Sequence, residues 1–299
     1  MKKSRVNKGS LFFSEIRMGI NEKKWCFICA LLLTTILCSG LFDNIRGWNI
    51  AQTTGIQSDK EIVCSFGDCF FYLFRGMKPF DPLARQPFEV PLQYMIFGII
   101  PVFIVGNYAV QDIHGFGKLK LVLSQSRLSW WMGKCLWNFV SVVIYIFSII
   151  IGILLSCLIH IKDMDTSSVG QFIYVNRDNV MRFITTNSML EKENVIESIF
   201  FIGRMLGAVL LTFIAMTLLQ MTLSLLINGA ISAIVIIAMY VFSAFYKSGY
   251  MPGNYIMFSR MDEFLVNGIS EGSVVAGSLF IVSICLITGY VVFRKKDIL

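Results

Sequence analysis

The chain has 299 residues, of which 56% are hydrophobic, 14% are aromatic and only 15% are charged. Soluble proteins carry about 25% charged residues, so this composition excludes a water-soluble domain of useful size. The net charge is +7, but no basic stripe interleaves with exposed aromatic residues, which argues against a nucleic-acid-binding protein. The composition therefore indicates an integral membrane protein.

Six apolar stretches are each long enough to cross a bilayer as a helix. A hydrocarbon core about 30 Å thick needs roughly 20 helical residues. The stretches lie near residues 25–42, 93–110, 135–159, 199–227, 230–246 and 273–293. Residues 143–156 are apolar on every side, whereas a barrel strand would alternate. The sequence predicts an all-α integral membrane protein with six transmembrane helices, forming a single domain over residues 1–299.

Residues 9–22 are amphipathic and precede the first span. Phe12, Phe13, Ile16 and Ile20 fall on one helical face, and the segment is flanked by lysines. This pattern predicts an interfacial helix along the membrane surface, which either only anchors the chain or also contacts a partner. The first span is longer than a signal-peptide core and lacks a clear cleavage site, so we expect the mature protein to keep it.

Lys and Arg are distributed unequally between the two sides of the spans. The segments on the N-terminal side are residues 1–24, 111–134 and 294–299. The loops on the opposite side are residues 43–92, 160–198 and 247–272. The first group holds fourteen Lys or Arg residues against four acids, and the second holds eleven against fifteen. The positive-inside rule therefore predicts that both termini are cytoplasmic.

The cytoplasmic loop at 111–134 is longer than a simple connection needs. Its two glycines interrupt the helix, and its tryptophan pair followed by a lysine is typical of a membrane interface. The residues that distinguish it are Asp112, His114, Gly115, Gly117, Lys118, Ser126, Arg127, Trp130, Trp131 and Lys134. We expect this loop to bind a partner; the alternative is an interfacial helix without a partner.

With these residues the chain resembles permease subunits of the type-2 ATP-binding-cassette (ABC) transporters. That family consists mostly of bacterial exporters with six spans, an N-terminal elbow helix and a helical cytoplasmic loop between spans two and three. In that loop an acidic residue, Gly, Leu, Ser-Arg and a basic residue follow in this order, and the tail often has an aromatic residue, a basic cluster and Asp, as at 293–297. Asp112 stands where many members carry Glu in a Glu-x-x-x-Gly-Thr pattern, the Thr is absent, and the first outer loop is longer than in many members.

The resemblance implies a function, partners and a location. The chain would be the permease subunit of an ATP-driven exporter in the bacterial plasma membrane, moving an amphipathic substrate such as an antimicrobial peptide, a lipid or a drug. The loop residues named above would contact a separate ATPase subunit, and a second permease, a copy or a homologue, would complete the transporter. The sequence has no Gly-x-x-x-x-Gly-Lys-Ser/Thr motif, so we expect no cofactor on this chain and ATP with Mg²⁺ on the partner.

Two other classes of function stay open. A membrane sensor or immunity protein would bind a peptide without transporting it, and a membrane-embedded enzyme would modify lipids. His114 and His160 are predicted on opposite sides of the membrane, and the sequence has neither His-Glu-x-x-His nor Gly-x-Ser-x-Gly. We therefore expect no catalytic site and no metal site.

Three residues within the spans are candidates for a substrate path. Arg204 either extends to the outer interface or serves as a counter-charge for an anionic group in the path. Pro101 frees a backbone carbonyl in the second span, which also contains Asn107. These two residues either form part of a gate or only adjust helix packing.

Cys64 and Cys69 lie in the first outer loop, on the oxidising side of the predicted topology. They either form a disulfide or are two buried thiols packed against the spans. The other cysteines lie in or at the ends of apolar helices and behave as small hydrophobic residues.

Overall fold

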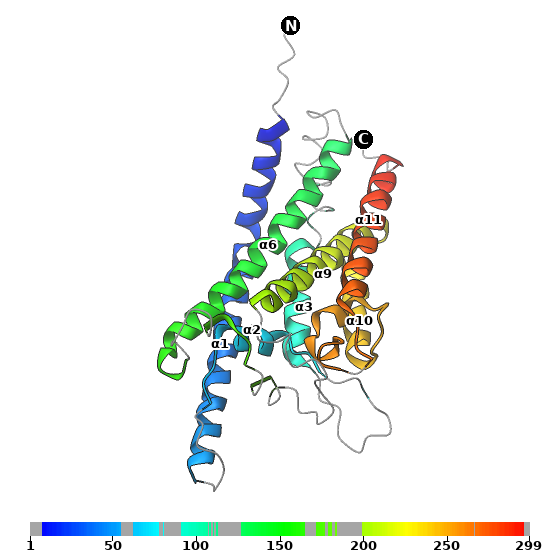
Figure 1. Ribbon diagram of the computed structural model, residues 1–299. Coiled ribbons are helices and arrows are strands. Elements are labelled where there is room, and N and C mark those ends of the chain that lie inside the picture. The colour runs from blue at the N-terminus through cyan, green and yellow to red at the C-terminus, as the bar shows by residue number, and fades with distance from the viewer. Residues whose placement is uncertain are drawn as a thin grey trace.

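The computed structural model shows an all-helical chain (Figure 1). It describes residues 8–54, 62–77, 80, 91–106, 108, 110, 112, 127–164, 172–176, 179–180, 183, 199–265 and 267–295. The α-helices in these ranges are α1 (Lys8–Thr54), α2 (Phe66–Phe74), α3 (Leu92–Val105), α6 (Arg127–Ile159), α9 (Ile199–Leu226), α10 (Gly229–Phe245) and α11 (Glu271–Lys295). The short 3-10 helices are η1 (Ile161–Asp163), η2 (Pro252–Ile256) and η3 (Phe258–Arg260).

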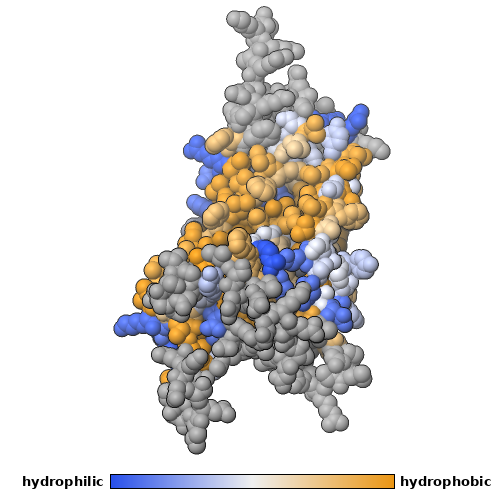
Figure 2. Space-filling view, in the orientation of Figure 1, coloured by the Kyte–Doolittle hydropathy of each residue, from blue (hydrophilic) through white to orange (hydrophobic). Residues whose placement is uncertain are grey.

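Four of the described helices, α1, α6, α9 and α11, are long and apolar enough to cross a membrane. The chain is thus a membrane protein with several candidate spans, and an apolar band covers much of the face drawn in Figure 2. Helices α3 and α10 have 14 and 17 residues. At 1.5 Å per residue they reach about 21 Å and about 26 Å, short of a hydrocarbon core about 30 Å thick. The six-span arrangement therefore stays a prediction.

The prediction of a separate interfacial helix at 9–22 was wrong. These residues form the first turns of α1, which continues without a break through the predicted first span and into the predicted outer loop. The residues between the two predicted segments are Lys23 and Lys24, and because lysine favours helix, the helix does not end there. The amphipathic segment packs on a neighbouring helix: a Cβ on Gly19 would lie 2.6 Å from the Trp137 ring of α6.

Helices α1 and α6 run side by side over much of their length (Figure 1). Small polar residues let them approach closely. Thr35 Oγ1 donates a hydrogen bond to the carbonyl of Gly152 at 3.2 Å, and the hydroxyls of Ser39 and Ser156 lie 3.2 Å apart. Such contacts replace the hydrophobic driving force that helices lack in lipid.

The two ends of the helix bundle differ. The start of α1, the start of α6 and the end of α11 lie at one end (Figure 1). We call this the terminal end. Helices α2, η2 and η3 lie near the other end, which we call the cap end (Figure 1). The topology with both termini on the cytoplasmic side stays a prediction.

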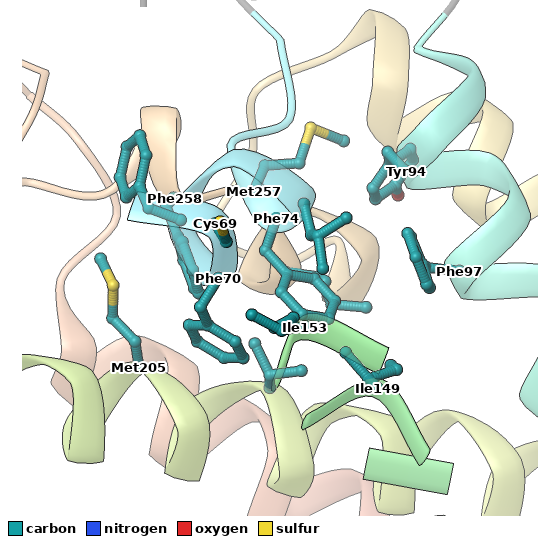
Figure 3. Packing of buried hydrophobic residues seen from close by; sticks show 14 of the residues in the cluster. Cys69, Phe70, Phe74, Tyr94, Phe97, Ile149, Ile153, Met205, Met257 and Phe258 are labelled. Atoms are coloured by element: carbon teal, nitrogen blue, oxygen red, sulfur yellow. The ribbon is translucent and has the colours of Figure 1, made fainter. Parts of the chain in front are cut away.

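An aromatic cluster holds the cap end together. Phe70 and Phe74 of α2 each lie 5.9 Å, between ring centroids, from Phe258 of η3, and Phe74 lies 5.8 Å from Phe97 of α3 (Figure 3). Helix α2 begins with a capping box, in which the Ser65 hydroxyl accepts the Asp68 backbone N–H and the Asp68 carboxylate accepts that of Ser65. Residues on either side of α3 in sequence are thus packed into one core.

Arg260 fixes η3 to the end of α10. The guanidinium is fully buried, and it donates hydrogen bonds to the carbonyls of Ser243, of Ala244 at 2.7 Å and of Met77 at 3.0 Å. The last carbonyls of a helix carry its negative dipole end and have no partners within the helix, so a cation there is stabilised. Burial lowers the pKa of Arg260 to about 10, which leaves it protonated at neutral pH.

Removing this cation should destabilise the whole cap. For Arg260→Met we expect a loss of about 3–5 kcal/mol, because several buried carbonyls lose their donor. The loss for Arg260→Lys should be smaller than for Arg260→Met but larger than zero, since the lysine ammonium keeps the charge but not the planar geometry. The measurement is thermal unfolding in detergent, monitored as the fraction of protein that remains monodisperse. Lys162→Met, on the exposed surface of η1, is the control and should change little. An unfolding temperature of Arg260→Met equal to that of wild type would contradict this role.

Candidate functional site

A buried ion pair lies at the terminal end, between the residues that follow α3 and the start of α6. Lys134 Nζ lies 2.7 Å from Asp112 Oδ2, and the indole Nε1 of Trp130 donates a hydrogen bond to the same oxygen at 3.2 Å. The Lys134 ammonium also lies 4.2 Å from the ring centroid of Tyr108. All four residues are buried. Lys134 is thus held by a carboxylate and by aromatic faces, which favour a cation.

The local sequence explains this arrangement. Trp130 and Lys134 are four residues apart on α6, so they project from the same face of the helix. That face meets Asp112, which the chain places just beyond the end of α3. A charge in apolar surroundings is stable only when paired, so the carboxylate and the ammonium fix how the two segments meet.

Two further contacts connect the start of α6 to the end of α11. Trp131 Nε1 donates a hydrogen bond to the carbonyl of Leu286 at 3.2 Å, and its ring occupies the space left by Gly289, where a Cβ would lie 2.1 Å away. The guanidinium of Arg127 donates a hydrogen bond to the carbonyl of Arg294. The terminal-end cluster, as we call Asp112, Arg127, Trp130, Trp131 and Lys134, therefore joins three segments that are distant in sequence.

Half of the loop residues predicted to bind a partner fall in this cluster. Four of the five are buried, so their side chains face the interior of the chain; Arg127 is half-buried. The other predicted loop residues lie outside the described part of the chain: His114, Gly115, Gly117, Lys118 and Ser126. Of the predicted path residues, Asn107 also lies outside it, and Pro101 is buried within α3.

Arg204 of α9 pairs with two carboxylates at the cap end. Its Nη2 lies 3.0 Å from Glu263 Oε1, and its Nη1 lies 3.3 Å from Glu271 Oε2. The Arg204 side chain is 43% exposed. The sequence alone predicted either an interfacial position or a counter-charge in a path for Arg204. It gave no sign of these two carboxylates, which lie 59 and 67 residues further along the chain.

Glu263 is the more deeply buried of the two carboxylates. Its side chain is 6% exposed, and its Oε2 has no hydrogen-bond partner among the described residues. Burial and, to a smaller extent, the neighbouring Glu271 carboxylate raise the pKa of Glu263 to about 7, although Arg204 acts in the opposite direction. At neutral pH the group therefore takes up or releases a proton easily.

A second buried carboxylate, Asp68, joins α2 to a distant segment. It accepts hydrogen bonds from the backbone N–H of Asn176 at 2.6 Å and from the side-chain amide of Asn179 at 2.7 Å. Burial raises the pKa of Asp68 to about 7, which these hydrogen bonds oppose. Nearby, Cys64 and Cys69 are both buried, with their Sγ atoms 3.8 Å apart. Among the described residues no group of three or more His, Cys, Asp or Glu side chains is suited to hold a metal ion.

A double-mutant cycle should show that Asp112 and Lys134 act as a unit. Asp112→Asn or Lys134→Met alone leaves one buried charge without its partner, so we expect each to cost about 3–5 kcal/mol. The double variant should cost clearly less than the sum of the two, as read from thermal unfolding in detergent. The same cycle on the exposed pair Arg46 and Asp163 is the control and should show little coupling. Additive losses at Asp112 and Lys134 would contradict the pairing.

Stability should fall as the pH rises through 7. Because the pKa of Glu263 is about 7 in the folded protein and about 4.3 in an unfolded chain, folding holds this proton more tightly. Its contribution is complete below about pH 4 and is lost as the pH passes the folded value.

We therefore expect the unfolding temperature to decrease from pH 5.5 to pH 8. Glu263→Gln, which imitates the protonated acid, should reduce that slope, and Asp68 should account for part of what remains. The control is Asp262→Asn, an exposed neighbour. A slope in Glu263→Gln as steep as in wild type would show that Glu263 does not titrate in this range.

The comparisons with known proteins identify a family without assigning an activity. No curated protein matches the chain, and no solved structure does. A family described as "Protein of unknown function (DUF2705)" matches residues 57–299, which include every described helix except α1. The chain therefore belongs to the DUF2705 family of proteins of unknown function.

Proposed function

We propose that this protein is the permease subunit of an ATP-driven ABC exporter. A separate ATPase chain would bind the segment between Asp112 and Arg127 and supply the energy. A second permease, a copy or a homologue, would complete the transporter in the bacterial plasma membrane. The cargo would be amphipathic, such as an antimicrobial peptide, a lipid or a drug.

The observation that carries the proposal is the terminal-end cluster. The two residues that flank the segment 113–126 are both tied to spans. Asp112 is bound to α6 through Lys134, and Arg127 is bound to the end of α11 through the carbonyl of Arg294. A partner that displaced this segment would therefore move α6 and α11 with it. Such a connection is what a transporter needs in order to turn ATP-driven movement outside the membrane into movement of its helices.

Burial suits these residues to transmit a displacement. Asp112 is 9% exposed and Lys134 is fully buried, so their ion pair is shielded from water and from salt. A solvated pair would exchange partners and absorb a displacement. We therefore assign the contact with the ATPase to residues within the segment 113–126, such as Lys118, and transmission of the movement to the buried pair.

The first experiment is purification of the tagged chain from its native membrane in a gentle detergent. We expect a P-loop ATPase to co-purify in stoichiometric amount, with ATPase activity. Lys118→Glu reverses one predicted contact charge and should lower ATPase recovery at least tenfold while leaving the chain folded. Lys162→Glu makes the same charge change on η1 and should leave recovery unchanged.

Three results would count against the proposal. Recovery of the chain without any ATPase would exclude a stable transporter complex. Recovery of a kinase in place of an ATPase would favour the membrane sensor. Equal loss of the ATPase in both charge variants would mean that the complex responds to net charge and not to this segment.

A further inference from the structure

Four of the eight cysteines of the chain lie together at the cap end. Cys38 comes from α1, Cys157 from α6, and Cys64 and Cys69 flank the first turn of α2. Each is at most 3% exposed. The Sγ atoms of Cys64 and Cys69 are 3.8 Å apart, and the Cys69 thiol also interacts with those of Cys38 and Cys157. Figure 3 shows Cys69 on α2 beside the aromatic cluster.

Cys64 belongs to a segment that connects several elements. Its backbone N–H donates a hydrogen bond to the carbonyl of Asp163 at 3.2 Å, and it forms an isolated bridge with Met164. The Asp163 carboxylate in turn accepts a hydrogen bond from Arg46 Nε of α1 at 3.0 Å. A covalent bond between Cys64 and Cys69 would attach this junction of α1 and η1 to α2.

We propose that Cys64 and Cys69 form a disulfide that closes the cap, and that Cys38 and Cys157 stay reduced beside it. The two sulfur atoms are in contact, and an S–S bond of about 2.05 Å requires them to approach by roughly 1.8 Å. The positive-inside rule places this end on the oxidising side of the membrane, where such bonds persist. The proposal is independent of the function proposed above.

The reaction needs an oxidant, which we identify as the disulfide of an extracytoplasmic thiol–disulfide oxidoreductase. One thiol of the pair loses its proton and attacks that disulfide, which forms a mixed disulfide and releases one oxidant thiol. The second thiol loses its proton and attacks the mixed disulfide, which forms the Cys64–Cys69 bond and releases the other. The pair gives up two protons and two electrons, and the oxidant becomes a dithiol.

Burial and sequence separation decide when the bond forms and between which thiols. Neither Cys64 nor Cys69 is exposed in the folded chain, so oxidation precedes closure of the cap. Cys64 and Cys69 are five residues apart and meet once α2 begins to form, whereas Cys38 and Cys157 reach them only after α1 and α6 have assembled. Once the cap has closed, the bond is shielded from reductants in solution.

The test is a map of the thiols in the full-length protein, purified from its native membrane without reductant. The protein is denatured in the presence of N-ethylmaleimide, digested and examined by mass spectrometry. We expect a linked peptide containing Cys64 and Cys69, and N-ethylmaleimide on the other six cysteines. N-ethylmaleimide on both Cys64 and Cys69 would overturn the proposal. A bond from either of them to Cys38 or Cys157 would overturn the pairing.

Variants separate the bond from the burial of the thiols. The double variant Cys64→Ser, Cys69→Ser should have an unfolding temperature lower than that of wild type by an amount on the order of 5 °C. Reducing the wild-type protein in denaturant should remove this difference between the two proteins. Cys38→Ser with Cys157→Ser is the matched control, and its linked peptide should remain. A water-soluble phosphine should reduce the bond in detergent-denatured protein and leave it intact in folded protein. Rapid reduction in folded protein would show that the cap does not seal the bond.

Discussion

A cation buried in apolar surroundings needs partners from its own chain, and each end of this helix bundle is organised around one. At the terminal end the ammonium of Lys134 meets the carboxylate of Asp112 at 2.7 Å. At the cap end the guanidinium of Arg260 meets the last carbonyls of α10, including that of Ala244 at 2.7 Å. Both contacts join segments that apolar packing alone would not orient, because dispersion has no preferred direction. The rest of each end packs around its cation.

The two cations do different work. Lys134 pairs with a full charge next to a segment whose ends are tied to α6 and α11, so its position depends on what that segment does. Arg260 binds the fixed dipole end of a helix and the carbonyl of Met77, so it holds a cap in place. The molecule thus combines an end suited to transmit movement with an end suited to resist it. The proposed exporter would need both properties.

The sequence predicted the apolar spans better than the contacts between them. Apolar length alone located α6, α9 and α11, because a helix in lipid must be long and apolar. By contrast, two separate segments were predicted within α1, because its residues change from amphipathic to apolar character although the backbone helix continues. Asp112 and Lys134 were both selected, but as residues that face a partner. Their contact with each other, like that of Arg204 with Glu263, depends on tertiary structure that no local pattern encodes.

The position of Arg260 also sets the order in which the protein can be completed. The carbonyls of Met77 and Ser243 cannot accept their hydrogen bonds until the ribosome has added Arg260, about 180 and 17 residues later. At a synthesis rate of roughly 5–20 residues per second, the region around α2 therefore spends roughly 10 to 40 seconds without its contacts to η3. Synthesis of α6 and α9, two of the long candidate spans, falls within that interval. The cap is therefore the last part of this region to mature, and a chain released before residue 260 would carry an open, apolar cap end.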